Sequence, residues 1–107
     1  MINELSMYVC VKKPNQAAFY GLIENSLETL QKFVGGYIEI VPLARDLVAI
    51  CNEEGRIYGL KPNCVISGID FVGPILLCGT KGEELSDIPY SKEDMEKYFP
   101  ELFKEGA

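Results

Sequence analysis

Glycine, proline and asparagine interrupt this chain at short intervals, and these interruptions limit it to short strands and short helices. Gly35-Gly36 ends a stretch with helical spacing, and the sequences Asn-Glu-Glu-Gly at 52–55 and Lys-Pro-Asn at 61–63 end two extended stretches. Glycine takes the left-handed conformation at little cost, asparagine can bond its own backbone, and proline removes a strand donor. Residues 34–63 are therefore expected to contain a helix end, a β-hairpin and a polar loop.

The pattern of apolar residues predicts strands along most of the chain, at residues 5–11, 17–24, 37–43, 47–51, 56–60 and 71–78. The first two strands are expected to form a hairpin through the turn at 12–15, and a bend is expected at Gly73-Pro74. Residues 64–69 fit either a strand or a loop. Residues 79–89 form a polar connection.

Two helices complete the predicted order. Apolar residues share one helical face in residues 27–34, with Asn25 as the expected N-cap and Gly35-Gly36 as the stop. Ser91 is expected to cap a C-terminal helix at about residues 91–103, which Pro100 interrupts. The sequence thus predicts one α+β domain over residues 1–107, with a mostly antiparallel sheet, one internal helix and one C-terminal helix.

Composition excludes several classes of protein. The 107 residues are 48% hydrophobic and 24% charged, which is typical of a folded domain. No apolar run approaches the roughly 20 residues that span a bilayer, and residues 1–4 lack the basic cluster of a secretory signal, so we expect a cytoplasmic protein without membrane contact. The net charge of −6 disfavours direct binding of nucleic acid. The acidic residues serve solubility or, alternatively, form a decoy for a basic partner surface.

The residue types needed for common catalytic and metal sites are missing. The chain has no histidine, and none of its four cysteines (Cys10, Cys51, Cys64 and Cys78) has the Cys-x-x-Cys spacing of a zinc site. We expect these cysteines to be small buried hydrophobic residues. No phosphate-binding glycine loop precedes a helix. We therefore assign no catalytic residue, no metal and no cofactor; acid–base chemistry by a carboxylate pair such as Glu39 and Glu53 is the one catalytic alternative.

Two motifs carry a family resemblance. With Gly-Gly-Tyr-Ile-Glu at 35–39 and Asn-Glu-Glu-Gly at 52–55, followed by Leu60 and Pro-Asn at 62–63, the chain resembles a family of small proteins from phages and mobile elements of Firmicutes. The resemblance covers about residues 27–79. The family is a domain of unknown function, so the resemblance implies an accessory or anti-defence role by context and no particular chemistry.

Polar and aromatic residues around these motifs form the candidate ligand-binding set. Asparagine amides suit a base or ribose edge, arginine suits phosphate, and a tyrosine on a strand can stack on a planar ligand. The alternative is that the asparagines and the glycine only build turns, with solvated glutamates between them. The candidate set comprises Tyr37, Glu39, Asn52, Glu53, Arg56, Tyr58 and Asn63.

These observations favour a phage-type accessory binding protein that sequesters a small nucleotide-like ligand without catalysis. We expect it to act as a homo-oligomer, because a small domain with exposed strand edges can enclose a ligand between copies. The alternative is a protein–protein inhibitor that blocks a host defence factor through an acidic and apolar surface. The third hypothesis is catalysis by Glu39 and Glu53.

Overall fold

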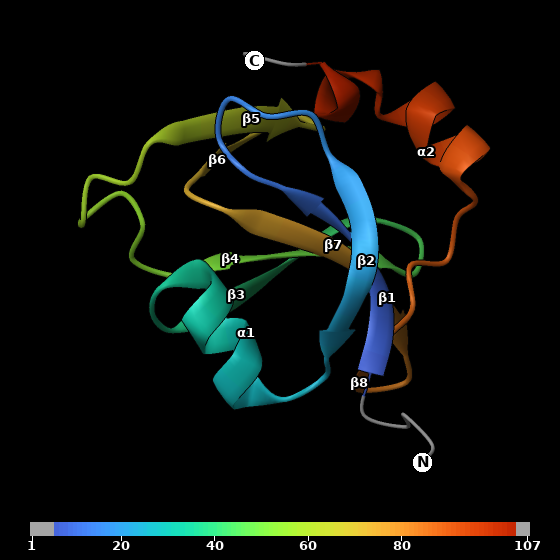
Figure 1. The fold of residues 1–107 in the computed structure, drawn as a ribbon, viewed down its shortest axis with the longest axis horizontal. Coiled ribbons are helices and arrows are strands. Elements are labelled where there is room, and N and C mark those ends of the chain that lie inside the picture. The colour runs from blue at the N-terminus through green and yellow to red at the C-terminus, as the bar shows by residue number, and fades with distance from the viewer. Residues whose placement is uncertain (1–5, 105–107) are drawn as a thin grey trace.

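A twisted antiparallel sheet forms the centre of the protein, in the computed structural model that describes residues 6–104 (Figure 1). The strand order is β2-β1-β7-β4-β3, and β8 extends the sheet by pairing with β7. The strands are β1 (Ser6–Lys12), β2 (Phe19–Glu24), β3 (Ile38–Ala44), β4 (Leu47–Asn52), β7 (Ile75–Lys81) and β8 (Glu84–Ser86). The predicted α+β class and the hairpin of the first two strands are confirmed. The expectations for residues 1–4 and for a strand start at Leu5 lie outside the described residues.

Each face of the sheet carries its own core, because alternate residues of the central strands point to opposite sides. Helix α1 (Leu27–Val34) covers one face, where Leu30 and Val34 pack on Val9, Ile50 and other apolar side chains. The second face is covered by the hairpin of β5 (Pro62–Ile66) and β6 (Ile69–Val72), by α2 (Lys92–Tyr98), and by a 3₁₀ turn, η1 (Pro100–Phe103).

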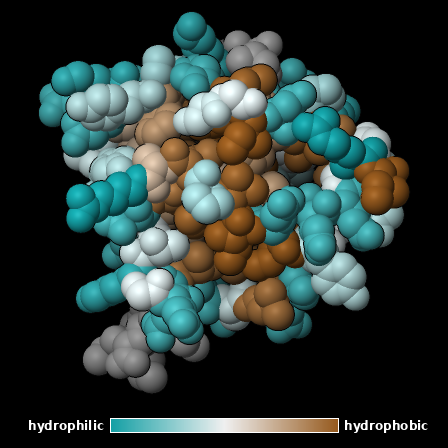
Figure 2. All heavy atoms as spheres, turned by 180° about the vertical axis from the view of Figure 1, so that it is seen from behind, coloured by the Kyte–Doolittle hydropathy of each residue, from teal (hydrophilic) through white to brown (hydrophobic). Residues whose placement is uncertain are grey.

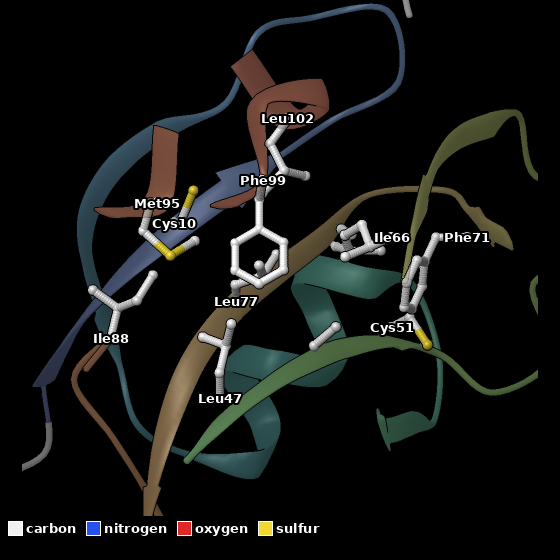
Figure 3. Close-up of a cluster of buried hydrophobic side chains, with 12 residues drawn as sticks. Cys10, Leu47, Cys51, Ile66, Phe71, Leu77, Ile88, Met95, Phe99 and Leu102 are labelled. Atoms are coloured by element: carbon white, nitrogen blue, oxygen red, sulfur yellow. The ribbon is translucent and has the colours of Figure 1, made fainter. Parts of the chain in front are cut away.

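The second core is the larger of the two, and Figure 3 shows how its side chains meet over β4 and β7. Leu47 and Leu77 rise from the sheet toward Phe99 and Leu102 of the C-terminal segment, while Phe71 of β6 lies over Cys51 at the far end of β4. The α2–η1 segment and the β5–β6 hairpin therefore cover different ends of the same face. A groove opens between this hairpin and β3.

Helix α1 forms where the spacing of its apolar residues predicts it, but its N-cap is Ser26 rather than Asn25. The Ser26 side chain accepts a hydrogen bond from the Thr29 amide, whereas the Asn25 side chain donates to the distant Leu85 main-chain oxygen. Gly35 ends the helix with φ +85°, and its amide donates to Gln31, as the glycine stop requires.

Residues 56–60 are not a strand, which corrects the sequence prediction. They form a looped turn in which the Leu60 amide donates to the Gly55 oxygen and the Tyr58 amide donates to the Glu54 oxygen. The apolar and aromatic residues of this segment suggest a strand, but among residues 6–104 no strand pairs with this segment, and it bonds to itself.

The structure assigns residues 64–69, which the sequence leaves open, and revises the segments that follow them. Residues 64–69 belong to the β5–β6 hairpin, which turns through Ser67 and Gly68. The prediction of one strand over residues 71–78 is wrong, because the chain breaks at Gly73-Pro74 between β6 and β7. The polar connection contains the short strand β8. At the C-terminus Ser91 caps α2 as expected, and Pro100 begins η1 because proline cannot continue the helix. Within residues 6–104, no helix is long and apolar enough to cross a membrane.

Candidate functional site

A groove of about 420 Å³ opens between the first half of β3, the end of β4 and strand β6. One wall is the first half of β3, the second is the loop that follows β4, and the third is β6. This volume falls in the range of small-ligand sites, roughly 300–1,000 Å³. The groove is lined by Glu39, Val41, Cys51, Asn52, Glu53, Glu54, Gly55, Arg56, Ile57, Ile69, Asp70, Phe71 and Val72.

The groove has an apolar floor and an acidic rim. Val41, Cys51 and Phe71 belong to the larger core and form the floor, so that part of this core reaches the surface here. Figure 2 shows the molecule from behind. On this side apolar side chains gather in the middle and polar side chains surround them. The rim carries one guanidinium, that of Arg56, and four carboxylates, those of Glu39, Glu53, Glu54 and Asp70.

The loop wall of the groove is held in place by Asn52. Its side-chain oxygen accepts a hydrogen bond of 2.7 Å from the Glu54 amide, and its main-chain oxygen accepts one of 3.2 Å from the Gly55 amide. Gly55 lies against β6, since a Cβ added there would lie 2.9 Å from a Val72 methyl carbon. The sequence pattern Asn-x-x-Gly therefore builds a turn that fits closely between two strands.

Arg56 joins this loop to the opposite wall. Its guanidinium donates a hydrogen bond of 2.7 Å to the Asp70 main-chain oxygen and lies 3.9 Å from the Asp70 carboxylate. Both side chains are more than 60% exposed, so the ion pair is worth at most about 1 kcal/mol. The guanidinium stands at the lip of the groove and is accessible to a ligand.

Two exposed tyrosines stand beside the groove rather than in its lining. Tyr58 is 62% exposed on the projecting loop, and Tyr37 is 67% exposed just before β3. The Tyr58 hydroxyl donates to a Glu54 carboxylate oxygen at 3.1 Å. This hydrogen bond is the main reason that the pKa of Tyr58 is raised above its usual value. The sequence predicts both tyrosines on strands, and this prediction is wrong: Tyr37 precedes β3 and Tyr58 lies in a turn.

Asn63 does not face this groove. It is buried in β5, where its side-chain nitrogen donates to the Lys12 oxygen at 2.9 Å and to the Gly73 oxygen at 2.7 Å. Its side-chain oxygen has no hydrogen-bond partner among the described residues. The structure therefore separates the two asparagines that the sequence places at one recognition edge. Of the candidate set, Glu39, Asn52, Glu53 and Arg56 line the groove, whereas Tyr37, Tyr58 and Asn63 do not.

The β6 wall is absent from the sequence-based candidate set. Ile69, Asp70 and Phe71 line the groove because the β5–β6 hairpin folds over the end of β4, which is distant in sequence. Only the alternation of apolar residues around Asp70 marks this segment as a strand. That signal does not reveal which part of the sheet the strand covers.

Cys10, Cys51 and Cys78 are buried, as the sequence predicts, whereas Cys64 is only partly buried. Burial raises the pKa of Cys10 and of Cys78 to about 12, and burial followed by the charge of Glu39 raises that of Cys51 to about 11. Cys51 is thus a neutral thiol in the groove floor at physiological pH and a poor nucleophile. Within the described residues, no cluster of cysteine and acidic side chains is arranged to hold a metal ion.

Comparison with known proteins gives one match. The profile of a family described as a domain of unknown function, DUF3846, matches residues 7–103, which include all of the sheet except Ser6, the groove and both helices. No curated protein and no solved structure matches the chain. The groove therefore has to be interpreted from its own chemistry.

Proposed function

The chain belongs to the DUF3846 family, and we propose that it is a non-catalytic binding protein that receives a basic segment of a partner protein in the groove between β3, β4 and β6. The observation that carries this proposal is the surplus of carboxylates around an apolar floor. An arrangement of this kind attracts a positively charged group over a distance and then gains from the burial of its hydrocarbon part.

The surroundings of the groove favour a macromolecular partner. Ile57 is 79% exposed and Tyr58 projects beside it on the loop that forms one wall. Large apolar and aromatic side chains next to a pocket are typical anchors of protein interfaces. An apolar floor, an acidic rim and an exposed apolar loop together form the acidic and apolar surface of an inhibitor. In the phage setting that the motifs imply, the partner would be a cytoplasmic host defence factor.

The second candidate is the capture of a small nucleotide-like ligand. Arg56 at the lip could meet a phosphate, and the volume of about 420 Å³ suits a ligand of that size. The four carboxylates of the rim oppose a phosphate, so this function requires a ligand with little negative charge or further cations. A homo-oligomer that adds residues from a second copy belongs to this candidate.

The catalytic alternative retains one favourable observation, since Glu39 and Glu53 line the same groove. Two carboxylates on opposite sides of a bound substrate suit acid–base chemistry. Loss of turnover in Glu39→Gln, with binding retained, would identify such an enzyme. We favour binding, because burial keeps the thiol of Cys51 in the groove floor protonated at neutral pH, and a carboxylate pair can occur in any acidic groove.

Affinity capture with a charge-reversed protein separates the candidates. We expect immobilised wild-type protein to retain a specific partner protein from a host lysate, and Glu39→Lys/Glu53→Lys to lose it. Glu83→Lys/Glu84→Lys serves as the matched control, because both residues are exposed at the β7–β8 turn and outside the groove. A partner retained equally by all three proteins would overturn the proposal. Small molecules released by heating the wild-type protein, and absent from the groove variant, would favour the second candidate.

A further inference from the structure

The free edge of β3 runs beside the groove, and we infer that the partner binds there as an added strand, with a basic residue opposite Glu39 and an apolar residue on each side of it. This inference rests on the proposed function and gives its partner a conformation and a sequence pattern. The direction of the peptide groups, the position of Pro42 and the side chains along β3 support it.

The hydrogen bonds of β3 determine which of its peptide groups are free. The Tyr37 oxygen accepts a hydrogen bond of 2.8 Å from the Glu53 amide, and the register pairs Ile38 with Asn52. Residues 37, 39 and 41 therefore turn their peptide groups toward β4, and Ile38 and Ile40 turn theirs outward. Among the strands of residues 6–104, β3 pairs with β4 alone, so these outward donors and acceptors face an open edge.

Pro42 limits this edge to a short segment. Pro42 lies two residues after Ile40, so its peptide groups also point outward. Because proline has no N–H, the outer edge lacks a donor at this position, and no hydrogen bond to β4 is lost. The register shift between Pro42 and Ala44 further distorts the strand at this end. The usable edge is the part of β3 that lies next to the groove, and a long strand cannot add along the full length of β3.

The side chains along this edge specify the added strand. A residue opposite Glu39 would form a non-hydrogen-bonded pair, in which the side chains approach most closely, and it would lie on the groove side of the sheet. A lysine or arginine there meets Glu39 and reaches the acidic rim. The residues before and after this basic residue lie on the other side of the sheet, beside Ile38 and Ile40. Ile40 is 46% exposed, so an apolar neighbour can pack on it. The expected pattern is apolar-basic-apolar.

A second copy of this chain fits the edge less well than a partner with that pattern. Two antiparallel β3 strands centred on Glu39 would place two carboxylates opposite each other, which is destabilising. Centred on Ile40, they would place Ile38 opposite Pro42, which has no donor. Charge complementarity therefore selects a basic strand of another protein.

Synthetic peptides test the geometry without changing the protein. The probe is the capped peptide Ser-Thr-Val-Lys-Val-Thr-Ser, titrated to millimolar concentration into ¹⁵N-labelled protein. We expect the amide signals of Ile38 and Ile40 to shift, and substitution of the lysine by glutamate to weaken binding about tenfold. Methylation of either valine N–H, which faces β3, is expected to weaken binding by about tenfold or more. Methylation of the lysine N–H, which faces outward, is the matched control and should leave the affinity unchanged.

Two proline variants test the edge from the side of the protein. Ile40→Pro removes an outward donor of β3, and Leu22→Pro removes the equivalent donor of the opposite edge strand. Leu22 lies opposite Tyr8 in β1, and the Tyr8 amide and oxygen bond to the Asp87 carboxylate and the Ile88 amide. Because Tyr8 therefore does not bond to Leu22, the peptide N–H of Leu22 faces outward. We expect Ile40→Pro to lose the peptide and Leu22→Pro to bind it as the wild-type protein does.

The outcomes separate this inference from the proposed function. Capture of a partner through the groove together with unchanged binding by Ile40→Pro would overturn strand addition and leave the function intact. Absence of shifts at Ile38 and Ile40, or equal affinity for both methylated peptides, would also overturn strand addition. If Ile40→Pro does not fold, the methylated peptides still decide, because they use the wild-type protein.

Discussion

The side-chain amide of Asn52 donates a hydrogen bond of 3.0 Å to the main-chain oxygen of Val34, and it thereby joins the end of β4 to the end of α1. The same side chain accepts the Glu54 amide at 2.7 Å, and the residue is buried. One asparagine thus satisfies a free carbonyl at the helix C-terminus and a free amide in the loop. The sequence predicts Asn52 as a ligand contact, but both polar atoms of its side chain are engaged with the backbone.

Replacement of Asn52 by alanine is therefore expected to act on the fold. Asn52→Ala leaves the Val34 oxygen and the Glu54 amide without their partners and should lower the free energy of unfolding by about 2–3 kcal/mol. Urea unfolding followed by circular dichroism measures this loss. Glu53→Ala, at the exposed neighbouring position, should change stability by less than about 0.5 kcal/mol. Asn52→Ala with wild-type stability would show that these two bonds contribute little.

Gly36 and Asn52 are expected to be energetically coupled. A Cβ added at Gly36 would lie 3.0 Å from the Asn52 side-chain nitrogen, so Gly36→Ala displaces the amide that bonds Val34. We expect Gly36→Ala to cost about 1–2 kcal/mol in the wild-type protein and clearly less in the Asn52→Ala background. A double-mutant cycle of unfolding free energies measures the coupling. Additive losses would mean that the amide is not displaced.

Replacement of Arg56 is expected to affect the fold much less than replacement of Asn63. Its guanidinium is exposed and its ion pair with Asp70 is long, so Arg56→Ala should lower stability by less than about 1 kcal/mol. Asn63→Ala is the contrast, because it removes two buried hydrogen bonds outside the groove and should cost about 2 kcal/mol or more. Thermal unfolding of the two variants gives the comparison. Similar losses of stability in the two variants would show that the contacts of Arg56 stabilise the fold.

Local features of the fold are predictable from the sequence because their causes are local. Gly35 adopts the left-handed conformation and ends α1, and Ser91 caps α2 through bonds to residues within four positions. The nearly continuous apolar runs of β4 and β7 likewise mark them as central strands, because both faces of each strand are buried.

The candidate site is less predictable because its walls come together only through tertiary contacts. Asp70 meets Arg56 because the β5–β6 hairpin folds over the end of β4, and no local pattern specifies that position. Asn63 has the composition of a recognition residue, yet it bonds the Lys12 oxygen across 51 sequence positions. The sequence does not distinguish an asparagine that binds a ligand from one that joins two strands. The burial of the side chain in the structure does.

The buried thiols should make the protein less stable at alkaline pH. Burial raises the pKa of Cys10 and of Cys78 from 9.0 to about 12, so these thiols ionise in the unfolded chain while they remain protonated in the fold. Above pH 9 the unfolded state loses protons first, and the free energy of unfolding falls as the pH rises toward 12. Below pH 9 this contribution to stability is fully present.

Comparison of Cys10→Ala with Val9→Ala isolates this effect. Both side chains are fully buried on β1, and both truncations should lower stability at pH 7, but only the first removes a titrating group. Between pH 9 and pH 10 we expect wild type and Val9→Ala to lose about 1 kcal/mol more than Cys10→Ala. The measurement stays below pH 10 because burial also raises the pKa of Tyr20, from 10.0 to about 12, and this tyrosine would add its own slope at higher pH. Equal slopes for the two variants would show that the Cys10 thiol ionises in the folded protein as readily as in the unfolded chain.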